Sequence, residues 1–107
     1  METIEIGVRN DIATCLKYKP KKRPTFILMH DSSNPTVRKA IAESPWAEHP
    51  HVHGVGLDFI PGVLFDRGDL RGQIWGGLAA AVMLPEKRSG ELSLEAPFEY
   101  SSTRNQS

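Results

Sequence analysis

The chain has 107 residues, of which 24% are charged and 39% hydrophobic, and its formal net charge is zero. This length limits it to one small domain, and the composition excludes a disordered or collagen-like chain. The balanced charge gives no electrostatic reason to expect nucleic acid or an anionic membrane surface as a partner.

Cysteine content and hydrophobicity also predict where the protein resides. The single cysteine, Cys15, excludes an internal disulfide and is typical of a reducing compartment. No stretch is long and apolar enough to span a bilayer, and residues 1–5 lack the basic and apolar regions of a signal peptide. We therefore expect a cytoplasmic protein with no membrane partner.

The first predicted element is a helix, because Val8, Ile12, Cys15 and Leu16 form one apolar stripe at helical spacing. The basic and proline-containing segment 19–24 ends this helix and is expected to be a solvated connector.

A buried strand is predicted next, because residues 26–29 are continuously apolar, which is typical of a strand buried on both faces of a parallel sheet. A second helix follows, with Asn34 as its cap and Pro35 in its first turn. Its buried side is expected to be Val37, Ala40 and Ile41, whereas Arg38, Lys39 and Glu43 are expected to face water. It should end by Ser44-Pro45, with Trp46 packing back on it.

The remainder of the chain predicts antiparallel β structure. Residues 51–60 read as a strand in which Val55, Leu57 and Phe59 share one face. Residues 73–84 predict a second long strand closed by Pro85, and residues 91–94 a short edge strand. The tail from residue 99 to 107 is polar and expected to be flexible.

The candidate catalytic residues are His30 and Asp31, which end the strand at 25–29 just before a helix starts. Ligands of open α/β sheets bind at the carboxyl ends of the strands, so a titratable pair there is a site candidate. An imidazole exchanges protons near neutral pH, so His30 could act as general base toward a hydroxyl. The alternative is that both residues only cap and orient the turn at 32–34.

Three further histidines, His49, His51 and His53, suggest a metal site because alternate residues of a strand project the same way. Two imidazoles leave a zinc site short of ligands, and Pro50 changes the chain direction, so a surface strand edge is the preferred interpretation.

The order helix, strand, helix and β segments resembles the C-terminal half of a class I S-adenosylmethionine-dependent methyltransferase. The motifs at residues 7–12 and 26–31 are similar to the sugar and small-molecule O-methyltransferase branch, near which cephalosporin-hydroxylase-like proteins belong. Residues 34–38, 57–62 and 74–78 are similar to later segments of the same branch, and the resemblance covers residues 5–95.

The resemblance implies an α/β fold with a partial Rossmann-like sheet over residues 1–98, whose last strand is inserted antiparallel in a terminal hairpin. It further implies a small-molecule acceptor with a reactive hydroxyl. Asp31 matches a position where the metal-dependent members hold a divalent cation such as Mg²⁺, whereas His30 departs from their commoner acidic residue.

The cofactor-binding half of that family is not represented in these residues. Gly54-Val55-Gly56 is the only candidate for a phosphate-binding turn, but Phe59 replaces the third glycine and no helix follows. We therefore expect a fragment or truncated homologue that binds S-adenosylmethionine poorly and is inactive alone. The alternative is a non-catalytic remnant that serves as an interaction module, including a homo-oligomer formed through the exposed edge of the strand at 25–29.

Overall fold

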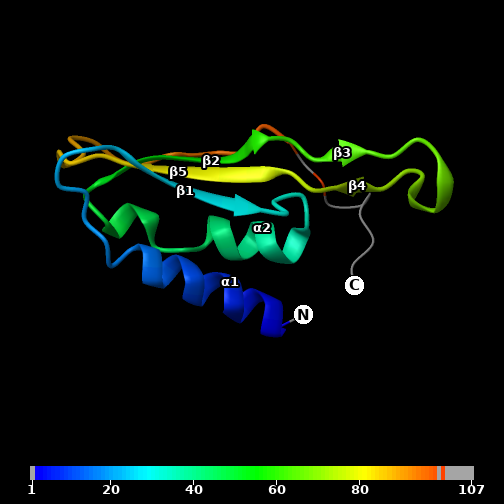
Figure 1. Cartoon of the computed structure of the whole chain (residues 1–107), viewed down its shortest axis with the longest axis horizontal. Helices are drawn as coiled ribbons and strands as arrows, with labels where there is room; N and C mark the ends of the chain where they lie inside the picture. The colour runs from blue at the N-terminus through cyan, green and yellow to red at the C-terminus, as the bar shows by residue number, and fades with distance from the viewer. Residues whose placement is uncertain (1, 99, 101–107) are drawn as a thin grey trace.

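The computed structural model describes residues 2–98 and 100 as a mixed α/β protein. Two helices, α1 (Glu2–Cys15) and α2 (Pro35–Ala42), lie on the same face of a sheet (Figure 1). The sheet contains β1 (Thr25–His30), β5 (Leu78–Met83), β2 (Val52–Ile60) and β6 (Leu94–Glu95), in that spatial order. A separate hairpin of β3 (Val63–Leu64) and β4 (Ile74–Trp75) extends beyond the end of the sheet (Figure 1).

Strand β5 is central to the sheet although it is the last long strand in the sequence. It pairs antiparallel with β1, where Leu28 lies opposite Ala80, and antiparallel with β2, where Gly56 lies opposite the same residue. The strands β1 and β2 are therefore parallel to each other, with β5 between them. The short β6 pairs parallel with β2 and forms the other side of the sheet.

The prediction that residues 25–29 are buried on both faces of a parallel sheet is wrong. Strand β1 lies at the sheet edge and pairs with the antiparallel β5. Ile27 and Met29 pack on the core beneath the helices, whereas Phe26 is 63% exposed and Leu28 is 59% exposed. The reason is that α1 and α2 both cover the same face, and the described residues place no helix over the other.

Two other strand predictions need correction. Val55 and Leu57 are buried as expected, but Phe59 is 65% exposed because the pairing of β2 with β5 shifts register between Gly56 and Ile60. Residues 73–84 do not form one strand, since Gly76 and Gly77 separate β4 from β5 with φ values of 79° and 87°. The predicted edge strand at 91–94 is observed as β6, displaced to Leu94–Glu95.

The core between the helices and the sheet agrees with the predicted apolar stripes. Ile12 of α1 and Ile41 of α2 are buried in it, together with Trp46, whose indole N–H donates to the carbonyl of Ile41 at 2.7 Å. Asn34 caps α2 as predicted, because its Oδ1 accepts the backbone N–H groups of Thr36 and Val37 at 2.9 and 3.4 Å.

Two polar side chains behave differently from the predictions. Arg38 does not face water: it forms a bidentate ion pair with Asp58 of β2, with both nitrogen–oxygen distances at 2.7 Å. Tyr100 lies in the tail that is expected to be flexible, yet it is 6% exposed, and its ring lies 5.0 Å from the Arg38 guanidinium. The other tail residues, 99 and 101–107, lie outside the described part of the chain.

Candidate functional site

The junction between β1 and α2 places both candidate catalytic residues at the carboxyl end of an edge strand. His30 is the last residue of β1 and is exposed, and Asp31 follows it half-buried. Asp31 has a φ of 67° and is the one non-glycine residue with positive φ among those described. This left-handed conformation is costly for most residues but tolerated by aspartate, and such residues concentrate at functional sites.

Backbone hydrogen bonds hold Asp31 in this conformation. Its N–H donates to the carbonyl of Gly77 at 2.9 Å, and its own carbonyl accepts the N–H of Asn34 at 3.0 Å. The N–H of Ser33 donates to the carbonyl of Gly76 at 3.0 Å. The turn that follows the catalytic candidates is therefore fixed to the start of β5.

Close packing of glycines supports the same turn. A Cβ atom added at Gly77 would lie 2.7 Å from Oγ of Ser32, and one added at Gly62 would lie 2.9 Å from Cβ of Ser33. Ser32 and Ser33 are both fully buried. Three segments that are distant in sequence thus meet beneath Asp31, and only glycine permits this approach at 62 and 77.

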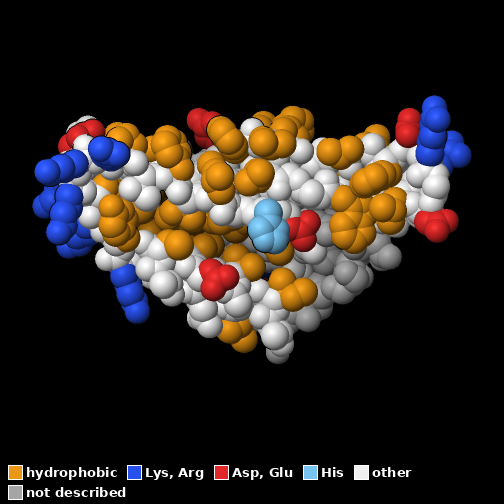
Figure 2. Space-filling view, in the orientation of Figure 1, with side chains coloured by type: hydrophobic (Ala, Val, Ile, Leu, Met, Phe, Trp, Pro, Cys, Tyr) orange, Lys and Arg blue, Asp and Glu red, His pale blue; other side chains and the backbone are white. Residues whose placement is uncertain are grey.

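An apolar groove of about 470 Å³ runs between α1 and β1 and reaches His30 and Asp31. Its walls include Ile4 and Val8 of α1 and Ile27 of β1. Figure 2 shows hydrophobic side chains lining this side of the molecule, with a histidine and an acidic side chain side by side on the same surface. The groove can hold the apolar body of a small molecule while a hydroxyl group faces the imidazole of His30.

The residues described here do not fit a resident divalent cation. No group of three or more histidine, cysteine, aspartate or glutamate side chains with metal-binding geometry occurs within residues 2–98 and 100. Mg²⁺ takes six ligands and is commonly held by at least one or two carboxylates with further oxygen partners. Asp31 is the carboxylate at this junction, so an ion there would need ligands from the acceptor or from another chain.

The same holds for S-adenosylmethionine. Gly54 and Gly56 lie inside β2, paired with β5, and not in a turn between a strand and a helix. Gly54 and Gly56 therefore do not form the glycine-rich turn that the resemblance implies for S-adenosylmethionine.

The other histidines are held by backbone carbonyls. His49 is 8% exposed, its Nδ1 accepts the N–H of His51, and its Nε2 lies 2.9 Å from the carbonyl oxygen of Tyr18. The rings of His51 and His53 lie 3.0 and 2.8 Å from the carbonyl oxygens of Leu84 and Glu86. The contacts of His51 and His53 fasten the start of β2 to the segment after β5, and that of His49 reaches the segment after α1, so all three have a structural role.

The sequence interpretation missed a cluster of Arg38, Asp58 and Tyr100, which contacts the glycine packing beneath Asp31. The Asp58 carboxylate has no exposed side-chain surface and also accepts the N–H of Phe98 at 3.3 Å. The hydroxyl of Tyr100 accepts the N–H of Gly62 at 3.1 Å, which connects this cluster to the glycine packing beneath Asp31. The signal for it was an aspartate between the apolar residues 57 and 59, since a charge there needs a buried partner.

Fold and site together define a mixed α/β protein with an open four-stranded sheet and a candidate polar site at the end of its edge strand. No family model matches the chain, and neither the curated proteins nor the solved structures give a significant match. None of the described helices is long and apolar enough to cross a membrane.

Proposed function

We propose that this chain is the acceptor-side half of an S-adenosylmethionine-dependent O-methyltransferase that acts on a hydroxyl of a sugar or other small molecule. In this proposal the chain forms part of a Rossmann-like sheet, and the cofactor is held by another part of the intact protein, not by these 107 residues. The chain alone is then inactive, and any divalent cation such as Mg²⁺ would bind together with the acceptor.

The observation that supports this proposal is the order of the strands. The parallel strands β1 and β2 are separated by β5, which is antiparallel to both and comes after them in the sequence. This order agrees with the inserted antiparallel last strand that the resemblance to class I methyltransferases implies. The location of α1 and α2 on one face agrees with a sheet whose other face is covered by the rest of such a domain (Figure 1).

The chemistry assigned to this half is preparation of the acceptor. A hydroxyl is a weak nucleophile until a base removes its proton, and the exposed imidazole of His30 can accept that proton. Asp31, held by the backbone of Gly77 and Asn34, would orient the acceptor or the imidazole. The apolar groove between α1 and β1 would bind the body of the acceptor.

Nuclear magnetic resonance of the labelled chain tests this role of the groove. Titration with a panel of monosaccharides and catechols, with and without Mg²⁺, should give saturable shifts of the amides at residues 30–32 for at least one compound. His30→Ala should weaken that binding at least about fivefold, because it removes one hydrogen bond worth about 1 kcal/mol. The control is His53→Ala, which alters a histidine outside the groove; equal weakening by both variants, or no saturable shift, would contradict the proposal.

Calorimetry tests the proposal that this chain does not itself bind the cofactor. Titration of the native chain with S-adenosylmethionine to millimolar concentration should give no binding heat, since the described residues contain no cofactor turn. Saturable heat would show that the chain holds the cofactor itself, and the half-domain assignment would then be wrong.

The alternative proposal is a non-catalytic interaction or oligomerisation module. The outer edge of β1 favours this alternative. The N–H of Asp31 donates to the carbonyl of Gly77, which fixes which residues of β1 form hydrogen bonds with β5. Because these residues alternate along an antiparallel strand, the backbone N–H and C=O groups of Phe26, Leu28 and His30 point away from β5. Such an edge can accept another strand, including one from a second copy. A chain that binds no hydroxyl compound in the titration above would favour this alternative.

A further inference from the structure

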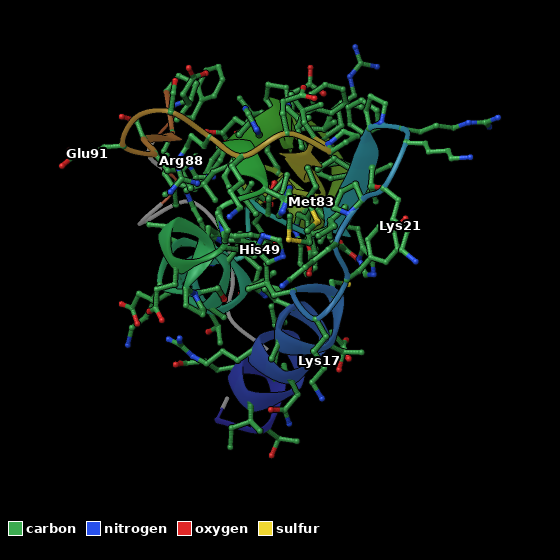
Figure 3. All side chains as sticks on the ribbon, turned by 90° about the vertical axis from the view of Figure 1, so that its left-hand side faces the viewer. Lys17, Lys21, His49, Met83, Arg88 and Glu91 are labelled. Carbon is green, nitrogen blue, oxygen red and sulfur yellow. The ribbon has the colours of Figure 1, made fainter. Side chains whose placement is uncertain are left out.

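The apolar groove between α1 and β1 is lined by fixed charges of one sign. Asp11 and Asp31 both line it, with His30 beside Asp31, and no lysine or arginine lines it among the described residues. Lys17 and Lys21 follow α1, and Figure 3, which faces the end of the molecule where that helix stops, shows both of them there. An anionic ligand would therefore meet two carboxylates in the groove and no compensating cation.

Asp11 is the one charged residue on the side of α1 that lines this groove. It is exposed, and it forms no hydrogen bond or ion pair with another residue in the described part of the chain. By contrast, Arg9 contacts Glu5 at 2.9 Å and Glu43 at 2.6 Å, so its charge is compensated elsewhere. The groove-lining residues of α1 recur at helical spacing, and they are Thr3, Ile4, Gly7, Val8, Asp11, Ile12 and Cys15.

The two ends of the groove differ in chemistry. The helix α1 and the strand β1 run in opposite directions, so the start of α1 lies near the end of β1, where His30 is found (Figure 1). From Ile4 to Asp11 the helix advances roughly 10 Å, at about 1.5 Å per residue. The groove therefore has an imidazole at one end and the Asp11 carboxylate farther along its length.

Gly7 lies between these two levels and leaves room in the wall of the groove. Glycine is unfavourable in the interior of a helix, and a Cβ atom added at Gly7 would meet no atom within 4 Å. A flexible apolar chain can therefore lie along the groove past Gly7, between Ile4 and Asp11.

From these features we propose that the acceptor is an amino alcohol, in which an apolar chain joins a hydroxyl group at His30 to a protonated amine at Asp11. This inference rests on the proposed function, because that function assigns the hydroxyl to His30. The elongated groove favours a linear apolar chain, and charge complementarity with Asp11 favours the amine. Asp31 adds negative charge at the hydroxyl end, which disfavours a carboxylate or phosphate on the acceptor.

Three matched ligands test the proposal on the native chain: octanol, its analogue with a terminal amine and its analogue with a terminal carboxylate. Binding is measured at neutral pH from the amide shifts of the labelled chain. The amine analogue should bind about threefold to fivefold more tightly than octanol, and the carboxylate analogue more weakly than octanol, because partly exposed charge pairs have effects of about this size. Equal affinities of the three ligands, or the reverse order, would overturn the proposal.

Two variants locate the amine. Asp11→Asn should remove the preference for the amine analogue and leave the affinity for octanol unchanged. The control is Asp69→Asn, which makes the same change in net charge outside the groove and should keep the preference. Gly7→Leu should weaken binding of the amine analogue at least about fivefold without lowering the urea midpoint, because leucine fills the groove but favours the helix. An amine preference that persists in Asp11→Asn, or full affinity in Gly7→Leu, would overturn the proposal.

The outcomes separate this inference from the proposed function. If a monosaccharide or catechol binds at residues 30–32 but the amine analogue does not, the proposed function stands and the amino alcohol is wrong. If the amine analogue binds through Asp11 but His30→Ala leaves its affinity unchanged, the groove is an amine-binding site and the proposed function is contradicted. Absence of binding by every compound would overturn both.

Discussion

Replacement of Asp58 by asparagine should destabilise the protein by about 3–5 kcal/mol, the range found when one partner of a buried ion pair is removed. The Asp58 side chain has no exposed surface and that of Arg38 is 14% exposed. Asp58→Asn keeps the shape of the side chain but leaves the guanidinium without its counter-charge. The free energy of unfolding in urea measures the effect.

The matched control for this variant is Glu43→Gln, which removes an ion pair on the surface. Glu43 is 53% exposed and contacts Arg9 at 2.6 Å. Solvent screens such pairs, so the urea midpoint should change little. Similar losses in the two variants would show that the Arg38–Asp58 pair does not act as a buried one.

The pH dependence of stability should report the same pair. Burial by itself raises the pKa of Asp58, but the hydrogen bonds and charge of Arg38, with the Phe98 N–H, outweigh it and hold the pKa below its usual value. The folded-state pKa is therefore lower than the unfolded one, near 3.8. The stabilisation is fully present above the unfolded value and is lost as the pH falls through the folded value. Asp58→Asn should flatten this acid limb, because its side chain does not titrate.

Replacement of Gly77 by alanine should cost about 2–5 kcal/mol and should also disturb the candidate site. A φ of 87° is strained for alanine by roughly 1–2 kcal/mol. The new Cβ would lie 2.7 Å from the buried Ser32 Oγ and 3.2 Å from the backbone nitrogen of Gly62, and such overpacking costs about 1–3 kcal/mol. Thermal or urea unfolding measures the loss, and the amide shifts of residues 30–33 report the disturbance of the turn.

Gly76→Ala is the matched control for Gly77→Ala. Its φ of 79° carries the same backbone strain, but its Cβ would meet nothing within 4 Å. The difference between the two variants therefore measures the contact with Ser32 and Gly62. Equal destabilisation would mean that this close approach does not hold the turn beneath Asp31.

Local patterns predicted the helices well, because their signals lie within a few residues. The spacing of Val8, Ile12 and Leu16 extends over little more than two helical turns and the Asn34 cap over one, and the structure confirms both. The pairing of β1 with β5 joins residues about fifty positions apart, so periodicity could not show that β1 is an edge strand. The register shift that exposes Phe59 is likewise a property of the strand pair and not of β2 alone.

The candidate site likewise has features that local sequence predicts and features that depend on contacts between distant segments. The position of His30 and Asp31 at the end of a strand could be predicted from the apolar run and the cap that follow each other in the sequence. The positive φ of Asp31 and the supporting contact of Gly77 could not, since they require segments around residues 31, 62 and 77 to meet. The ion pair of Arg38 was missed because its partner Asp58 lies on another element.

The central position of β5 also determines when this chain can fold. β1 and β2 are parallel and have no direct pairing, so neither can complete the sheet until residues 78–83 are available. During synthesis, about three quarters of the chain must therefore be made before the sheet forms, and loop closure over these distances slows the search. Until then the apolar strands Thr25–His30 and Val52–Ile60 are both unpaired, which makes this interval the time of greatest aggregation risk and of greatest need for a chaperone.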